Sequence, residues 1–226
     1  MQESTEQRTA RWAIVVTGAQ PFDPDLIADI PNDVEVIAAD SGLDHALAAG
    51  LTPSTVVGDF DSISEAGRRW ADANATVVRH PVDKDATDTE LALAIAADLN
   101  PDHLVLVSGG GDRLDHTFAA IGALASPVLV SVPVLEARWG TQRIRVLHGP
   151  GRAVIPTTVG ATVSVLALAG PATGVGLAGT KWTLDREDLG PLVGRGVSNV
   201  ATDDTVTVTV TTGVLAVFHS IEVAAS

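Results

Sequence analysis

Two aspartates separated by one residue, Asp59 and Asp61, follow the apolar pair Val56 and Val57 in the stretch VVGDFDSIS. Like charges this close repel, and each raises the proton affinity of the other unless a cation or hydrogen-bond donors offset them. Three more groups of aspartates stand after short apolar runs of the first half. They are Asp40 and Asp44, then Asp83, Asp85 and Asp88, and finally Asp112 and Asp115.

Each acidic group taken alone is compatible with a solvated turn or a helix cap. Four such groups together favour a magnesium site, because Mg²⁺ prefers oxygen ligands and is held by carboxylates together with substrate phosphates. The stretch SGGGDRLDH, residues 108–116, supplies groups that complement phosphate. The N–H groups of a glycine run can approach phosphates, a helix start near Leu114 favours anions, and Arg113 can bind a phosphate through two hydrogen bonds.

Structural explanations compete with these assignments. Arg113 and Asp115 could simply form an ion pair, and a single histidine such as His116 is more often structural than catalytic. The glycine run lacks the G-x-x-x-x-G-K-[ST] pattern of a P-loop. The chain shows no Ser/His/Asp triad and no histidine spacing typical of zinc, and it contains no cysteine, which excludes thiolate chemistry and disulfides.

The elements that would position these groups alternate along the first half of the chain. Short runs rich in Val and Ile predict strands covered on both faces at 11–19, 33–40, 54–59, 75–80 and 102–110. Helices are expected between them, at 43–50, 63–73, 86–100 and 114–125. This alternation predicts an α/β fold with a doubly wound, mostly parallel sheet. The acidic groups then lie at the carboxyl ends of the strands, where such sheets bind ligands.

The second half is rich in Val, Thr and Gly and has few helix formers. Strands are expected at 161–169, 174–184 and 204–218, the last as a hairpin about Gly213. This pattern favours a small antiparallel β-sandwich or barrel. We therefore expect a disordered tail at 1–10, an α/β domain at 11–135 and a β-sandwich domain at 136–226.

Composition narrows the classes of partner. The 226 residues carry a formal net charge of -14, so binding to DNA, RNA or anionic membranes is not expected. The first residues, MQESTEQRTAR, are polar, and the apolar WAIVV that follows is too short for a signal peptide or a membrane span. We expect a soluble, cytoplasmic protein.

The order of the motifs resembles that of the thiamine pyrophosphokinase family. The stretches that carry the resemblance are AADSGLDHALAAGLTPSTVVGDFDSIS, DKDATDTELAL, SGGGDRLDHTFAAI and GVGLAGTKWTLDREDLGPLVGRGVSN. Two motifs depart from the family's usual form: Ser41, Leu43 and Asp44 alter a common D-G-G-A-N, and Ser108 and Asp112 replace two glycines of the loop. The resemblance implies an α/β domain for ATP, a β-sandwich domain for thiamine, and a homodimer with its sites between the subunits.

The resemblance also implies a reaction, in which pyrophosphate passes from ATP to the hydroxyl of thiamine and yields thiamine diphosphate and AMP. By this resemblance, the Mg²⁺ ligands are Asp40, Asp59, Asp61 and Asp88. Lys84 and Arg113 would contact phosphate, and Asp115 would hold Arg113 or the substrate. The residues that would contact thiamine are Trp182, Ser198 and Asn199. Further expected contacts to ATP are Asp85, Thr87, Ser108, Gly109, Gly110, Gly111 and His116. A cationic thiazolium would be attracted to the indole face of Trp182, although a packed aromatic is the simpler explanation of that residue.

Two other functions stay open on the sequence. A pyrophosphokinase for another acceptor, such as a hydroxymethyldihydropterin, would use the same carboxylates with a different pocket. A nucleotide-binding regulatory protein without catalysis would account for Asp112 and for the altered first motif.

Overall fold

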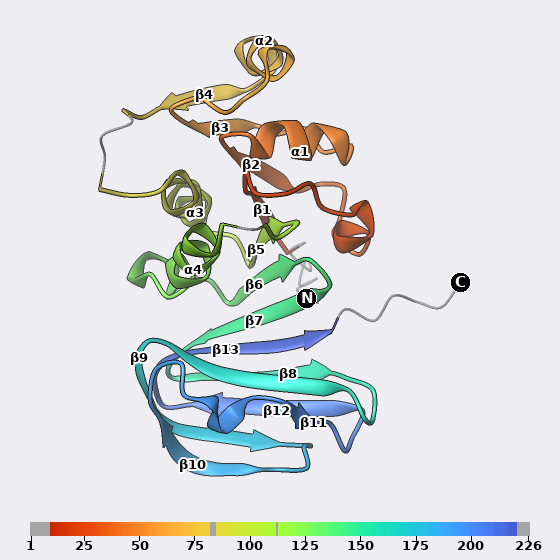
Figure 1. Cartoon of the computed structure of the whole chain (residues 1–226), viewed down its shortest axis with the longest axis vertical. Coiled ribbons are helices and arrows are strands. Elements are labelled where there is room, and N and C mark those ends of the chain that lie inside the picture. Colours follow the sequence, from red (N-terminus) through yellow and green to blue (C-terminus); the bar gives the residue numbers. More distant parts are fainter. Residues whose placement is uncertain (1–9, 82–84, 112, 221–226) are drawn as a thin grey trace, which may run out of the picture.

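A parallel sheet forms the first half of the molecule. The computed structural model describes residues 10–81, 85–111 and 113–220, so most of the expected tail lies outside the described residues (Figure 1). The strand order is β4-β3-β2-β1-β5-β6, and each neighbouring pair is parallel. The bounds are β1 Trp12–Val16, β2 Glu35–Ala39, β3 Thr55–Gly58, β4 Thr76–Arg79, β5 His103–Ser108 and β6 Val134–Trp139. Edge strand β4 is not covered on both faces, contrary to the expectation for 75–80.

Helices cover both faces of this sheet, which confirms the doubly wound arrangement. Helices α1 (Gly42–Ala48) and α2 (Glu65–Asn74) pack on one face, together with the short 3-10 segment η1 (Pro24–Ile27). Helices α3 (Asp88–Asp98) and α4 (Leu114–Ala123) pack on the other face, and η2 (Pro127–Leu129) follows them. Three alanines and one leucine of α3 are buried against the sheet, at Ala92, Leu93, Ala96 and Ala97.

Local sequence explains where these helices start. Thr87 and Glu90 form a capping box, in which each side chain accepts a hydrogen bond from the other residue's backbone N–H. The Ser64 hydroxyl likewise accepts from the N–H of Gly67 at the start of α2, at 2.9 Å. These caps satisfy N–H groups that the first helical turn would otherwise leave without partners.

The strand order reverses beside β1. The chain builds β2, β3 and β4 outward on one side of β1 and then places β5 and β6 on its other side. The connections therefore diverge at the carboxyl ends of β1 and β5, and a crevice opens there in sheets of this kind. The expected acidic and glycine-rich loops all leave the sheet at this edge.

The β-rich half continues the same ladder of strands. The hairpin of β6 and β7 (Gln142–His148) joins it to β13 (Thr212–Ser220), and β13 pairs with β9 (Thr162–Ala178). The remaining elements are β8 Gly151–Pro156, β10 Leu184–Leu189, η3 Gly194–Gly196, β11 Asn199–Val200 and β12 Thr205–Val210. Two layers of strands enclose a core that includes Val163, Val165, Leu215, Val175 and Val208, and Figure 1 shows this sandwich below the parallel sheet.

Two expectations for this half are wrong. Residues 161–169 and 174–184 do not form two strands, because β9 runs continuously through 162–178 and bends near Ala169 and Gly174, where φ is positive. The hairpin about Gly213 is also wrong: β12 pairs with the last part of β9, whereas β13 pairs mainly with its first part. The turn between β12 and β13 thus moves the chain from one layer to the other.

The expected domain boundary at 135/136 falls inside β6, which belongs to the parallel sheet. The division into domains stays a prediction. Among the described residues, no helix is long and apolar enough to cross a membrane.

Candidate nucleotide and metal site

A cavity of about 590 Å³ lies at the carboxyl edge of the parallel sheet. Its walls come from the loops after β1, β2, β3 and β5, from the first turns of α3 and α4, and from the end of β6. The expected site residues that line it are Asp40, Asp59, Thr87, Asp88, Gly111, Arg113, Asp115 and His116. The loops that carry the predicted site residues therefore meet at one place.

Asp40 lines this cavity, and the backbone of the next strand passes close beside its carboxyl group. It follows β2 with a positive φ of 47°, and the N–H of Phe60 donates to its Oδ1 at 3.3 Å. A Cβ on Gly58, whose φ is +150°, would lie only 1.9 Å from the same oxygen. Glycine at position 58 is thus what lets the end of β3 pass beside the Asp40 carboxyl group.

The carboxyl groups of Asp40 and Asp88 are hydrogen-bonded to each other. Burial, this hydrogen bond and the negative charge of Asp88 raise the pKa of Asp40 to about 7, and Asp59 adds to the rise. Two carboxyl groups in such contact need either a shared proton or a cation between them. The oxygen donor set is the kind that Mg²⁺ prefers, so the residues present fit this ion.

Asp61 lies outside the cavity lining. Its side chain is exposed, and its backbone N–H donates to Asp59 Oδ1 at 3.0 Å. Within 10–81, 85–111 and 113–220, no group of three or more His, Cys, Asp or Glu side chains is already placed to hold a metal ion. Of the four expected metal ligands, Asp40, Asp59 and Asp88 line the cavity and Asp61 does not, and the carboxyl groups of Asp40 and Asp88 are in contact.

Arg113 and Asp115 form the ion pair that was the competing explanation for both. Arg113 donates from Nε to Asp115 Oδ1 at 3.0 Å and from Nη2 to Oδ2 at 2.6 Å. These bonds hold the pKa of Asp115 below its usual value, and His116 Nε2 lies 4.0 Å from the same carboxylate. Both partners are exposed at the cavity, so an exposed pair of this kind can exchange for a phosphate at small cost.

Most of the glycine run stabilises its own loop and does not line the cavity. The N–H of Gly110 donates to the buried Ser108 Oγ at 3.2 Å, and the N–H of Gly109 donates to the carbonyl of Gln20 at 3.2 Å. Ser108, Gly109 and Gly110 do not line the cavity, nor does Asp85, whereas Gly111 does. Lys84, Asp83 and Asp112 lie outside the described residues.

Sequence reasoning missed two parts of the wall. Thr17, Gly18 and Gln20 line the cavity directly after β1, and the Thr17 hydroxyl is buried there without a hydrogen-bond partner in the described part of the chain. Trp139, the last residue of β6, also lines it. The signal for the first group was available, because the end of the first strand flanks the crevice in sheets of this type. Trp139 required knowledge that β6 pairs with β5.

The expected thiamine contacts lie in the β-rich half, and none of the three lines the cavity. Asn199 is buried: its Oδ1 accepts from the N–H of Trp182 at 3.1 Å, and its Nδ2 donates to the Trp182 carbonyl at 2.5 Å. Ser198 has a positive φ of 59° and donates its N–H to Ser164 Oγ. Trp182 is 55% exposed, and Lys181 Nζ lies 4.6 Å from the centroid of its ring. Asn199 therefore holds the segment that presents the indole.

Comparisons with known proteins identify the relatives of this chain. Residues 30–134 match the family model described as thiamin pyrophosphokinase, catalytic domain, and residues 144–215 match that of its vitamin B1 binding domain. The chain belongs to the thiamine pyrophosphokinase family. This family is one of enzymes, so the expectation of an enzyme is confirmed at that level.

Individual members of the thiamine pyrophosphokinase family agree with this placement. A curated thiamine pyrophosphokinase from Bacillus subtilis is 33% identical over 122 residues, a match that spans 54% of this chain and 57% of the relative. The crystal structure of thiamine pyrophosphokinase from Bacillus subtilis superposes with a TM-score of 0.79 at 25% identity, covering 94% of this chain and 100% of the other. The yeast enzyme, at 14% identity, shows the same fold with a TM-score of 0.74, covering 96% of this chain and 88% of its own.

Proposed function

We propose that this chain transfers pyrophosphate from ATP to the hydroxyl of thiamine, giving thiamine diphosphate and AMP, with Mg²⁺ as the required ion. The observation that carries the proposal is the meeting of Asp40, Asp59 and Asp88 with Gly111 and Arg113 in one cavity. The match of residues 144–215 to a vitamin B1 binding domain favours thiamine over a pterin as the acceptor. The charge and the cysteine-free sequence are compatible with a cytoplasmic location, which we include in the proposal.

Some cavity residues would bind the metal ion, and others would bind phosphate. Asp40, Asp59 and Asp88 would bind Mg²⁺, and Asp61 would join them if its side chain turned toward the phosphates. When bound, Mg²⁺ would neutralise charge on the β- and γ-phosphates and so lower the repulsion from the carboxylates. Arg113 would leave Asp115 to bind a phosphate, next to the N-terminal end of α4. Catalysis of this kind rests on positioning and electrostatic stabilisation.

The acceptor site requires a second copy of the chain in this proposal. Leu114 and Phe118 on α4 are 66% and 62% exposed, although neighbouring residues of α4 line the cavity. In the β-rich half, the large apolar residues Trp182, Leu192 and Val197 are also exposed. Exposed apolar side chains next to a site are typical of interaction surfaces. We propose a homodimer in which the Trp182 region of one subunit closes the cavity of the other.

The decisive experiment incubates the purified chain with ATP, Mg²⁺ and thiamine and identifies the products by mass. Thiamine diphosphate and AMP in equal amounts, both lost on chelation of the metal, would support the proposal. AMP formation with a hydroxymethylpterin but not with thiamine would overturn the choice of acceptor. Binding of ATP without any thiamine-dependent AMP would overturn the proposed catalysis.

A further inference from the structure

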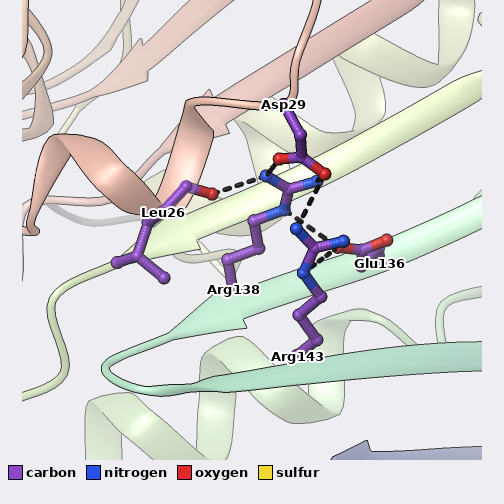
Figure 2. A network of polar contacts seen from close by, with 5 residues as sticks. All are labelled: Leu26, Asp29, Glu136, Arg138 and Arg143. Carbon is purple, nitrogen blue, oxygen red and sulfur yellow. Dashed lines mark hydrogen bonds and ion pairs between the residues drawn. The ribbon is translucent and has the colours of Figure 1, made fainter. Parts of the chain in front are cut away.

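Arg138 on β6 is the largest side chain that is fully buried among the described residues, with an exposure of 1%. A buried guanidinium is costly unless its N–H groups are paired, and here they are paired closely. Nε donates to Glu136 Oε1 at 2.8 Å, and Nη1 donates to Asp29 Oδ1 and to the Leu26 carbonyl, each at 2.5 Å. Figure 2 shows the guanidinium between these groups, with Arg143 reaching the same two carboxylates.

The partners of Arg138 belong to two separate elements. Glu136 is on its own strand, but Leu26 and Asp29 lie in and just after η1, more than 100 residues away in sequence. The connection from β1 to β2 contains only this short 3-10 turn, whereas the other connections of the sheet contain α-helices. Arg138 thus binds a connection that contains no α-helix.

The same connection forms a wall of the cavity at its other end. Residues 17–20, directly after β1, line the cavity. The N–H of Gln20 donates to the Gly110 carbonyl at 2.9 Å, and a Cβ on Gly109 would lie 2.1 Å from the Pro21 carbonyl oxygen. Residues 17–30 are therefore held at one end by the glycine loop and at the other by Arg138. Trp139, the next residue after Arg138, reaches the cavity itself.

We propose that Arg138 is a positioning residue for the nucleotide site, which sets the wall at residues 17–20 through its bonds to Asp29 and Leu26. The identity of the ligand as ATP rests on the proposed function, whereas the coupling between Arg138 and the wall does not. A purely structural Arg138 would contribute to stability and leave the wall unchanged. The two roles predict different results when the ion pair between Arg138 and Asp29 is weakened. Only a positioning role predicts that the backbone hydrogen bonds of Gln20 and Gly109 open more often.

The test uses Asp29→Asn, which weakens the pair at its half-exposed end and leaves Arg138 in place, together with Arg138→Met. Arg69→Met is the matched control, because it breaks an exposed arginine–glutamate pair on α2, remote from residues 17–30. Hydrogen exchange at the amides of Gln20 and Gly109 is measured on the folded proteins, followed by calorimetry with a non-hydrolysable ATP analogue and Mg²⁺. Thermal melts establish which variants are folded.

We expect exchange at Gln20 and Gly109 to be about 10-fold faster in Asp29→Asn than in the wild type and in Arg69→Met. We also expect the analogue to bind about 10-fold more weakly, because a small displacement of the residues that contact a ligand lowers its affinity. Unchanged exchange at both amides in folded Asp29→Asn would overturn the proposal, and so would faster exchange with unchanged affinity. If the wild type bound no analogue, the proposed function would fail, and the exchange rates alone would decide the role of Arg138.

Discussion

The cavity at the edge of the parallel sheet and the exposed loops of the β-rich half use their polar groups in different ways. In the cavity, Asp40 and Asp88 are pressed together, and the pKa of Asp40 is raised to about 7 by burial and by its partner. In the β-rich half, both ends of the Asn199 amide bond to the backbone of Trp182, and the indole faces solvent. The carboxyl groups of the cavity are therefore suited to binding a cation, whereas the β-rich half presents an aromatic surface whose position is fixed.

The difference suggests how a bisubstrate site could be shared. An acidic cavity that must be neutralised suits a nucleotide that arrives with Mg²⁺. An exposed indole suits a flat organic cation, which needs no metal. Removing the polar or aromatic groups of one region should therefore weaken the use of one substrate and leave the use of the other unchanged.

The largest effect is expected for the carboxylates of the cavity. Asp59→Asn and Asp88→Asn should each lower kcat/KM by about 100- to 1,000-fold, because they remove charge that holds the metal against the phosphates. Asp72→Asn, an exposed aspartate on α2, is the control and should keep wild-type activity. Steady-state assays of AMP release check this. Near-normal activity of Asp59→Asn and Asp88→Asn would contradict the metal assignment.

Asp61→Asn is a separate case, since its side chain lies outside the cavity lining. We expect a loss of activity of similar size, because we propose that the side chain turns inward with ATP and Mg²⁺ bound. Its activity should be measured over a range of Mg²⁺ concentrations. Retained activity would restrict the metal ligands to Asp40, Asp59 and Asp88.

A mixing experiment can sharpen the contrast between the two regions. At a thiamine concentration well below the wild-type KM, Asp88→Asn and Trp182→Ala should each have low activity alone. Mixed together, they can rebuild one intact site if each site takes residues from two subunits. Half of the mixed dimers would be hybrids with one intact site of two, so roughly a quarter of wild-type activity should return. Activity of the mixture equal to the mean of the two variants would show that each site lies within one subunit.

Trp182 should give a smaller effect that is confined to the acceptor. Trp182→Ala is expected to raise the KM for thiamine about 5- to 30-fold with little change in the KM for ATP, because a cation over an indole contributes about 1–2 kcal/mol. Trp182→Phe keeps a ring and should lose less. Kinetics with each substrate varied in turn test this. A change confined to the KM for ATP would contradict the division between the regions.

The strands and helices of the first half followed from the sequence because their signals are local. The Val-rich runs, the Thr87–Glu90 cap and the Ser64 cap each depend on residues within a few positions of one another. The errors arose where pairing is remote. No local sequence signal distinguishes two strands at 161–184 from one bent strand. The prediction of a hairpin at Gly213 was wrong because β12 and β13 pair with different parts of β9 instead of with each other.

The candidate site divides in the same way. Asp40, Asp59 and Asp88 could be predicted, since each stands directly after a strand or at a helix start in one repeating pattern. Trp139 could not, because it reaches the cavity only through the pairing of β6 with β5. Arg138 gave no signal either, since its partners Leu26 and Asp29 are brought to it by the course of the β1–β2 connection.

The smallest predicted effect concerns pH and the stability of the metal-free protein. A carboxyl group whose pKa rises from 3.8 to about 7 on folding contributes stability that is fully present below about pH 4 and is lost as the pH rises through 7. Asp40→Asn removes this dependence, so the variant should match the wild type near pH 4 and exceed it at pH 8. The Asp40 carboxyl group is half-buried, so we expect a gain in the free energy of unfolding of about 1 kcal/mol, or about 2–4 °C in Tm.

Thermal melts in the presence of a chelator at both pH values test this prediction, with Asp72→Asn as the control for loss of a surface charge. An Asp40→Asn variant less stable than the wild type at pH 8 would mean that Asp40 and Asp88 are not in repulsive contact, and the case for a cation between them would lose its physical basis.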